Sequence, residues 1–286
     1  MVEVADAVDS VPSELRAWQG RACAMPSAHR HDDLEVNLVA EAPLRYLFGG
    51  TPVDIGPGRI GVFWAAMPHR LIDCPDNWRA RVCWLHVPLS IVLEWGLPDE
   101  AVARLLGGTP LLCSSGALRA TPEHFRQWSA DLSDGSTELR QIALLEIQAM
   151  VRRLVHLAID QKPLAGARAR AWAEGDEAVR HAAAMAEFAA TRFRESITAG
   201  DVAAAVHLHP NYAMTVFRRV VGTTLGAYLT QCRVAEAQRL LITTTATTSD
   251  IAVAAGFGSQ SSFYAAFGRA CGQSPGAYRR SYRGAG

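Results

Sequence analysis

The 286-residue sequence lacks the marks of several large classes of protein. It has no run of about 18 uncharged apolar residues, the length at which a membrane-spanning helix is considered. Its first ten residues are acidic and contain no apolar signal region. Its six cysteines form no close pairs and show no metal-type spacing. These absences predict a cytoplasmic protein with free thiols and argue against secretion and membrane insertion.

Motifs for common enzyme chemistry are missing as well. The sequence contains no Ser-His-Asp grouping, phosphate-binding loop or nucleotide fingerprint. The length leaves room for two domains, and a hydrophobic content of 49% is enough for two ordinary cores. We therefore predict a two-domain protein that is not an enzyme.

The net charge is zero, but charge is spread unevenly along the chain. Residues 177–286 hold 11 arginines, no lysine and 6 acidic residues, a balance of +5. By subtraction, residues 1–176 hold 17 basic and 22 acidic residues, a balance of −5. A positive C-terminal part is what contact with phosphates requires, although such a charge is also common in proteins that never bind DNA.

The C-terminal part contains one supersecondary pattern twice. Each copy opens with Thr-x-x-Asp, at Thr198 or Thr247, in which the two side chains can cap the start of a helix. An apolar run, a break and a second apolar run follow, and each copy ends with a glycine, Gly222 or Gly272, where a helix would stop. Two short helices joined by a tight turn form a helix-turn-helix, whose second helix can enter the DNA major groove.

Residues 224–241 have apolar side chains at helical spacing, which predicts a long helix between the two copies. The whole block resembles the double helix-turn-helix of AraC-type transcription regulators. This resemblance implies a sequence-specific regulator, more often an activator, that binds double-stranded promoter DNA, works with RNA polymerase and forms a homodimer. The residues that carry it are Ala203-Ala204, Asn211-Tyr212, Phe217-Arg218-Arg219, Gly222, Arg233 to Leu241, Asp250-Ile-Ala252, Gly256-Phe257, Phe263, Phe267 and Gly272 to Arg279.

In the predicted second helix of the first copy, Phe217 marks the buried side, and the opposite side is expected to meet DNA. Asparagine can pair with adenine, arginine with guanine or phosphate, and the threonine methyl can meet thymine. In the second copy the outer side carries the small Ala265 and Gly268, so we predict weaker base reading there. The expected DNA contacts are Asn211, Thr215, Arg218 and Arg219 in the first copy, and Ser259, Gln260, Ser261, Tyr264 and Arg269 in the second.

The N-terminal half predicts short strands separated by glycine and proline turns, which favours a sandwich or small barrel. Residues 1–20 are expected to be a loosely ordered lead-in. Strands are expected at 31–40, 44–48, 53–55, 60–65 and 78–87. Alternation places His29, His31, Asp33, Glu35 and Asn37 on one face, which is either solvated or lines the interior of a barrel.

The spacing His29-x-His31-x-x-x-Glu35, followed by His69, resembles the two motifs of the cupin barrel (double-stranded β-helix). In metal-binding cupins the matching residues hold one divalent ion, and imidazole and carboxylate suit zinc, manganese or iron. Sensor domains of AraC-type regulators often keep such residues as the floor of an effector pocket without a metal. The two readings, effector pocket and divalent metal site, both remain open.

The expected effector pocket consists of His29, His31, Glu35, Asn37, Trp64 and His69, with the flat Trp64 ring available to a sugar unless it is a core residue. Within the family the likeness is greatest to regulators of α-galactoside use, and it reaches the N-terminal half through His29-Arg-His31, Phe63-Trp64-Ala65 and Pro68-His69. It implies carbohydrate sensing with a small sugar effector of the α-galactoside class. The alternative is a cupin metal-dependent sensor, or a metalloenzyme that carries a DNA-binding module.

A helix expected over 138–159 has a heptad seam with two readings. It either packs on the barrel or pairs in a homodimer, which the family resemblance favours. The seam consists of Leu144, Ile147, Val151, Leu154 and Ala158. We expect an effector-sensing and dimerisation domain at 1–160, a linker rich in Ala, Gly and Arg at 161–176, and the DNA-binding domain at 177–284.

Overall fold

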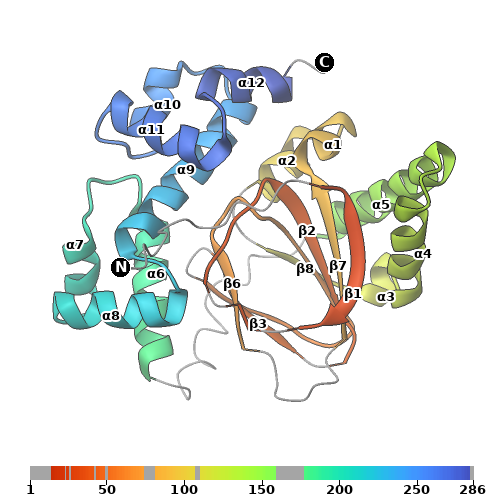
Figure 1. The fold of residues 1–286 in the computed structure, drawn as a ribbon, viewed down its shortest axis with the longest axis horizontal. Helices are drawn as coiled ribbons and strands as arrows, with labels where there is room; N and C mark the ends of the chain where they lie inside the picture. The colour runs from red at the N-terminus through yellow and green to blue at the C-terminus, as the bar shows by residue number, and fades with distance from the viewer. Residues whose placement is uncertain are drawn as a thin grey trace, which may run out of the picture.

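A computed structural model describes residues 14–22, 24–25, 27–41, 43–48, 51–73, 81–106, 110–158 and 177–283. Within these ranges, a sheet-rich N-terminal part is followed by a helical C-terminal part, as predicted (Figure 1). The expected linker at 161–176 lies outside the described residues. No helix in the described ranges is both long and apolar enough to cross a membrane.

Two antiparallel sheets build the N-terminal part. The first has the strand order β1-β7-β2-β5-β8, and the second has the order β4-β3-β6. They face each other (Figure 1), and Phe63 of the first contacts Phe48 of the second with ring centroids 4.7 Å apart. The strands are Arg16–Arg21 (β1), Asp33–Val39 (β2), Leu44–Phe48 (β3), Thr51–Ile55 (β4), Arg59–Trp64 (β5), His69–Asp73 (β6), Arg81–Pro88 (β7) and Leu111–Ser114 (β8).

The lead-in expected for residues 1–20 is wrong for its last part. Residues Arg16–Arg21 form β1, which pairs with β7 along its whole length and places Trp18 opposite Trp84. Ala17 is 4% exposed because it packs into the core on the outer side of the first sheet. A six-residue strand with one strongly apolar position has too little alternation to be recognised from sequence.

The register of the first sheet separates polar from apolar side chains. Leu34, Val36 and Leu38 of β2 are fully buried on its outer face, in one core with residues of helices α4 and α5. Glu35 and Asn37 point the other way, between the two sheets, because side chains alternate along a strand. The predicted alternation of this strand is therefore present, and its polar face is enclosed rather than solvated.

The helices of the N-terminal part cover the outer face and one end of the first sheet (Figure 1). In α5, Ile147, Val151 and Leu154 are fully buried in the core that includes the first sheet. These seam residues therefore agree with the prediction that the helix packs on the barrel. In this arrangement they are not free to pair with a second chain. The helices are Leu89–Glu94 (α1), Asp99–Leu105 (α2), Ser115–Leu118 (α3), Pro122–Ser133 (α4) and Thr137–Ala158 (α5).

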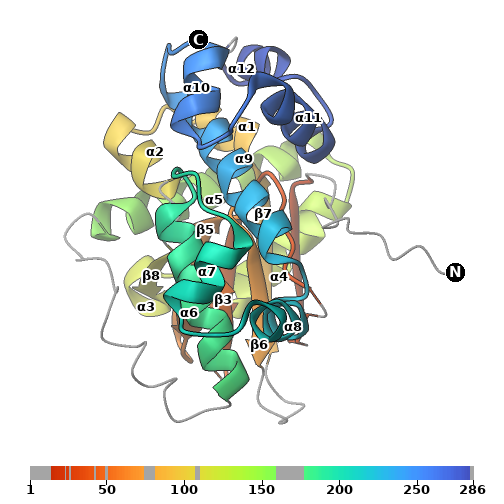
Figure 2. The ribbon, with the colours of Figure 1, turned by 90° about the vertical axis from the view of Figure 1, so that its left-hand side faces the viewer.

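The C-terminal part consists of seven helices in the described residues, with α9 running between two similar helix pairs (Figure 2). The pairs are α7 with α8 and α10 with α11, and both second helices contain 12 residues. The predicted connecting helix is confirmed as α9. The bounds are Glu177–Arg192 (α6), Ala199–Ala205 (α7), Pro210–Val221 (α8), Leu225–Thr243 (α9), Thr248–Ala254 (α10), Gln260–Cys271 (α11) and Pro275–Arg283 (α12).

The repeated sequence signals have the same structural role in both pairs. Thr198 and Thr247 each form a capping box with the aspartate three residues later. Gly222 and Gly272 each end the second helix with a left-handed backbone, at φ of 82° and 67°. Only glycine adopts this conformation at little cost, so these residues terminate the helices as predicted.

The turn of the second pair requires glycine at position 256. Gly256 has φ of +84°, and a Cβ atom there would lie 2.4 Å from the backbone oxygen of Phe193. We expect Gly256→Ala to lower the free energy of unfolding by about 2–3 kcal/mol, because it adds backbone strain and a steric clash. Gly258→Ala in the same turn is the control, since its Cβ would meet no atom within 4 Å. Equal urea-denaturation midpoints for the two variants would contradict this prediction.

Candidate nucleic-acid interface and polar cluster

The exposed side of α8 carries the residues predicted to read DNA. Asn211, Thr215, Arg218 and Arg219 are all exposed, whereas Phe217 is fully buried. The Thr215 hydroxyl donates to the backbone oxygen of Asn211 at 2.9 Å. This bond engages its polar atom inside the helix. Asn211 and Arg218 are exposed on this face, and their amide and guanidinium groups can bond to base edges.

Sequence reasoning missed two exposed apolar side chains on α8. Tyr212 is 49% exposed and Met214 is 46% exposed, an unusual exposure for large apolar groups on a short helix. They flank the predicted polar contacts, so the surface combines hydrogen-bonding and apolar groups. Their positions beside Asn211, at helical spacing, were the sequence signal that could have identified both as surface residues.

The exposed side of α11 carries the polar residues expected to contact DNA together with small side chains. Gln260, Ser261 and Arg269 are exposed, and Ala265 lies among them. The hydroxyl of Tyr264, which is 43% exposed, donates to the Thr248 hydroxyl at 3.2 Å. Ser259 caps the helix by accepting from the Ser262 amide at 3.1 Å. Its side chain therefore has a local structural role in addition to its predicted place at the DNA surface.

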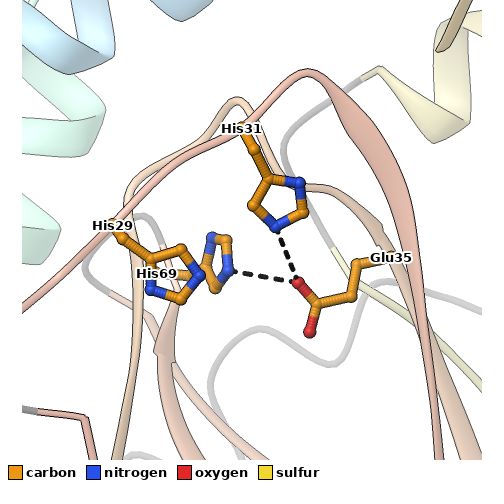
Figure 3. Close-up of side chains that lie close together, drawn as sticks. All are labelled: His29, His31, Glu35 and His69. Carbon is orange, nitrogen blue, oxygen red and sulfur yellow. Dashed lines mark hydrogen bonds and ion pairs between the residues drawn. The ribbon is translucent and has the colours of Figure 1, made fainter. Parts of the chain in front are cut away.

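Between the two sheets lies a group of polar side chains that we call the polar cluster: His29, His31, Asp33, Glu35, Asn37, His69 and His86. Glu35 is at its centre (Figure 3). Its Oε2 lies 3.2 Å from His31 Nε2 and 3.3 Å from His69 Nε2. Its Oε1 accepts from the Asn37 amide at 3.0 Å. Five of the six residues of the predicted effector pocket come together here.

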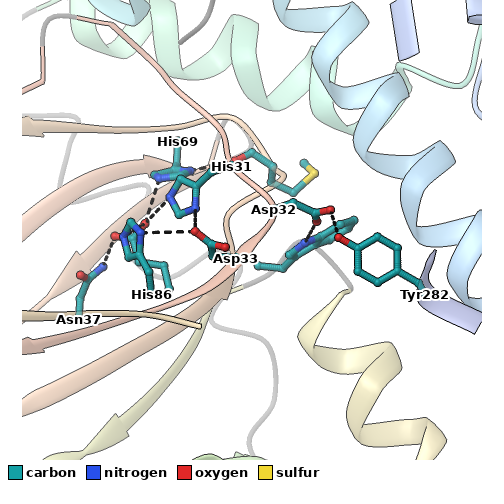
Figure 4. A network of polar contacts seen from close by, with 10 residues as sticks. His31, Asp32, Asp33, Asn37, His69, His86 and Tyr282 are labelled. Carbon is teal, nitrogen blue, oxygen red and sulfur yellow. Dashed lines mark hydrogen bonds and ion pairs between the residues drawn. The ribbon is translucent and has the colours of Figure 1, made fainter. Parts of the chain in front are cut away.

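Two members of the polar cluster were not among the predicted site residues (Figure 4). Asp33 Oδ2 lies 2.9 Å from His31 Nδ1 and 3.5 Å from His86 Nδ1. His86 stacks on His31 with ring centroids 4.3 Å apart. Asp33 belonged to the predicted polar face, whereas the sequence indicates His86 only as a weaker pocket candidate. The pairing of β7 with β2 places His86 opposite Glu35.

The sixth predicted pocket residue, Trp64, lies elsewhere. Trp64 is paired with Leu34 and therefore faces the outer side of the first sheet, away from Glu35. It is 1% exposed, and its indole N–H donates to Asp32 at 3.0 Å. Its expected role as a surface for a sugar is thus corrected to that of a core residue. Inside the sheets Trp84 and Trp18 are partly exposed and stacked with ring centroids 5.6 Å apart, and Phe48 and Phe63 lie against His69.

The polar cluster shifts the protonation of its members in different directions. Burial alone would lower the pKa of His31, but hydrogen bonds with Asp33 and Glu35 outweigh burial and raise it to about 9. Burial would raise the pKa of Glu35, but His31 and His69 hold it well below its usual range. Burial and the neighbouring His69 lower the pKa of His29 to about 3. A charged His31 beside a charged Glu35 and a neutral His29 follows at neutral pH.

These shifts predict a pH dependence of stability. The folded-state pKa of His31 lies above the ordinary histidine value of 6.5, so its stabilising effect is complete below pH 6.5 and is lost as pH rises through 9. His29 acts in the opposite direction, only below pH 6.5. We expect the free energy of unfolding to fall by on the order of 2–3 kcal/mol between pH 6.5 and 9.

The measurement is chemical denaturation with chelator present across this pH window. His31→Gln should remove the decrease, because the titrating group is gone. His156→Gln, at an exposed position on α5, is the control and should keep it. A His31→Gln profile parallel to that of the wild type would show that another group is responsible.

The chain is similar in sequence to known helix-turn-helix regulators. A family model described as a helix-turn-helix domain matches residues 202–281. The melibiose operon regulatory protein of Escherichia coli (strain K12) is 32% identical over 260 residues, which cover 90% of this chain and 84% of that protein. The HTH-type transcriptional activator AarP of Providencia stuartii is 44% identical over 69 residues, 24% of this chain and 51% of that protein.

Among solved structures, ToxT from Vibrio cholerae O395 covers 95% of this chain and 98% of that chain, at 10% identity and a TM-score of 0.37. That score is too low for the two folds to be equated. The sequence match extends over nine-tenths of the chain, and the structure contains the tandem helix-turn-helix. The chain belongs to the AraC-type family of DNA-binding transcription regulators.

Proposed function

We propose that this regulator binds a small sugar in the polar cluster and that binding changes how its two helix-turn-helix units engage promoter DNA. The observation that supports it most is the enclosed polar cluster in a chain whose exposed recognition helices α8 and α11 belong to a transcription regulator. A sugar of the α-galactoside class is the proposed effector. It is favoured by the similarity to the melibiose operon regulatory protein, which extends over both parts of the chain.

The chemistry of the polar cluster suits a hydroxyl-rich ligand. Asn37 Oδ1 is buried and has no hydrogen-bond partner among the described residues. A buried polar atom without a partner costs about 1–3 kcal/mol, which a ligand hydroxyl would recover. Trp18 and Trp84 lie next to His86 and offer apolar surface of the kind that stacks on sugar rings.

A divalent metal ion is the second candidate for the same cluster. Four residues each offer one metal-ligand atom, and these atoms all lie within 4.8 Å of one another: His29, His31, Glu35 and His69. His69 Nδ1 donates to the Met67 backbone oxygen at 3.0 Å, which directs the Nε2 lone pair toward Glu35. Such an outer hydrogen bond is the arrangement that orients a histidine ligand. This candidate makes the protein a metal-dependent sensor or, with turnover, a metalloenzyme, although the similar proteins are regulators.

A thermal-shift screen separates the two candidates. Melibiose, raffinose, galactose and arabinose are each added to the full chain with and without chelator. A ligand that binds only the folded state raises the melting temperature, by an amount corresponding to about 2.7 kcal/mol at 100 times its Kd. We expect a rise with an α-galactoside that survives chelation. No rise with any sugar and a large loss of stability in chelator would favour the metal.

Four finer assignments belong to the same proposal. We assign the two facing sheets to a cupin-like barrel and the domain bounds to 1–160, 161–176 and 177–284. Activation through RNA polymerase is proposed by analogy with the family. A homodimer is proposed as well, but the seam on α5 cannot form it in this arrangement; the exposed apolar residues of that helix are Ile142, Leu145 and Leu157. Sedimentation of the full chain tests the dimer.

A further inference from the structure

Residues 28–33 lie between the polar cluster and the C-terminal helices, and their side chains contact both in alternation. His29, His31 and Asp33 belong to the polar cluster. The backbone N–H groups of His29 and His31 donate to the oxygens of His69 and Ala65, each at 3.0 Å, which fixes the segment against the rim of the sheets. We call residues 28–33 the coupling segment.

Asp32 faces the C-terminal helices (Figure 4). The hydroxyls of Tyr278 and Tyr282 on α12 donate to Asp32 Oδ2 at 2.6 and 2.7 Å. The Trp64 indole donates to Oδ1 at 3.0 Å. No arginine or lysine makes an ion pair with Asp32 within the described residues, so three neutral donors stabilise this carboxylate. Hydrogen bonds to a charged group are about twice as strong as neutral ones, so the contact with α12 is a firm one.

Arg30 closes a ring of hydrogen bonds through α9. Arg30 is 5% exposed and donates to Gln238 Oε1 at 2.6 Å. The Gln238 amide in turn donates to the Tyr278 hydroxyl at 2.9 Å. The ring therefore runs from the coupling segment to α9, on to α12, and back to Asp32. Because each member of such a network polarises the next, displacing one member disturbs the others.

The coupling segment also reaches the first helix-turn-helix. The Ala28 amide donates to the oxygen of Val221, the last residue of α8, at 2.8 Å. Its side chain is 2% exposed in the core formed by α6, α7 and α8. On the other side, the Tyr278 ring packs against Phe267 of α11 with centroids 5.3 Å apart. The coupling segment thus contacts α8 of the first unit directly and reaches α11 of the second unit through Tyr278.

We propose that the coupling segment transmits occupancy of the polar cluster to both helix-turn-helix units. The inference rests on the proposed role of the cluster as the effector site. A ligand that moves His29, His31 or Asp33 must move the same peptide units that carry Ala28, Arg30 and Asp32. The ring to α9 and α12 is then strained or relaxed, and the two units change their position relative to the sheets. Coupling of this kind is typically worth a ~5- to 150-fold change in affinity, in both directions.

The test compares three full-length proteins: wild type, the double variant Tyr278→Phe with Tyr282→Phe, and the control Tyr228→Phe. The double variant removes two hydroxyl donors to Asp32 and keeps both rings. Tyr228 on α9 is as buried as Tyr278, but it makes no hydrogen bond to the coupling segment. The duplex is selected from random sequence by the wild type, and the probes are melibiose and ZnCl2, used separately. Binding of each probe and of DNA is measured by calorimetry and fluorescence anisotropy.

We expect a probe to change the DNA affinity of the wild type and of Tyr228→Phe by at least ~5-fold. The double variant should bind that probe as the wild type does, yet change its DNA affinity less than about twofold. A double variant that keeps the full change would overturn the proposal. Tyr282→Phe alone, at a less buried position, serves if the double variant does not fold, and it should show a reduced change.

A second arm needs no ligand, so it separates this proposal from the proposed function. Glu35→Gln alters the polar cluster from inside, and hydrogen exchange is followed in peptides covering α9 and α12. We expect faster exchange in 275–283 for Glu35→Gln than for the wild type, because the coupling segment links the two sites. If neither probe binds but exchange in 275–283 is faster, the proposed effector is rejected and the coupling is retained. Unchanged exchange in α9 and α12 would reject the coupling.

Discussion

Glu35→Ala is expected to lower the free energy of unfolding by about 3–5 kcal/mol, the usual cost of removing one partner from a buried charge pair. The Glu35 carboxylate is 2% exposed and accepts from Asn37 while it faces His31 and His69. Removal of the carboxylate leaves His31, whose pKa is raised, paired with Asp33 alone. It also removes the 3.0 Å hydrogen bond that the Asn37 amide donates to Glu35. Urea denaturation at pH 7 with chelator measures the change.

Glu41→Ala is the matched control for this prediction. Glu41 is an exposed carboxylate in the same part of the chain, so its removal should change stability by no more than about 0.5 kcal/mol. Similar losses for the two variants would mean that the polar cluster is no more than a solvated group of charges. In that case the sensor-site proposal would lose its structural basis.

Asn211→Ala is expected to weaken binding to a selected duplex by about 1–3 kcal/mol, or roughly 5- to 150-fold. Asn211 is exposed at the start of α8, and an asparagine amide can make two hydrogen bonds to adenine. Gln260→Ala is expected to cost less. The neighbouring Ala265 and Gly268 on α11 contribute no polar groups, and the Tyr264 hydroxyl is already bonded to Thr248.

Gel-shift titrations of Asn211→Ala and Gln260→Ala with one duplex decide the ranking. Arg219→Ala provides a reference for a phosphate contact, which should weaken binding to all sequences alike and lower the salt dependence. A larger loss for Gln260→Ala than for Asn211→Ala would refute the ranking. It would assign the main base reading to the second helix-turn-helix.

The C-terminal part was predictable because its signals are local. Thr198 and Thr247 cap the first helix of each pair, which begins with the next residue, and Gly222 and Gly272 end the second helix of each pair. Each signal acts within one or two turns of chain, so its meaning does not depend on distant residues. The exposed and buried sides of α8 and α11 followed from helical periodicity alone.

The polar cluster was predictable only in part because it is assembled from distant strands. The alternation of β2 predicted that Glu35 and Asn37 share a face, but the faces of β5 and β7 depend on strand register. Register places Trp64 beside Leu34 on the outer face and His86 opposite Glu35 on the inner one. A one-residue shift in the pairing of a strand moves all of its side chains to the opposite face. The pairing register of β5 and β7 could not be read from the sequence alone.

The contacts of Arg30 and Asp32 were beyond sequence reasoning for a similar reason. Their partners Gln238, Tyr278 and Tyr282 are more than 200 residues away along the chain. Tyr278 belonged to the family pattern, yet the pattern gave no partner for its hydroxyl. Only the packing of the two parts against each other shows that adjacent residues of one segment serve different sites.

The most direct test of the account is the affinity of the full chain for its selected duplex, measured with and without melibiose in the presence of chelator. We expect saturating sugar to change the Kd by at least ~5-fold, and a scrambled duplex of the same length to show weak binding with no such change. An unchanged Kd, while the sugar demonstrably binds, would contradict the claim that the polar cluster controls DNA recognition.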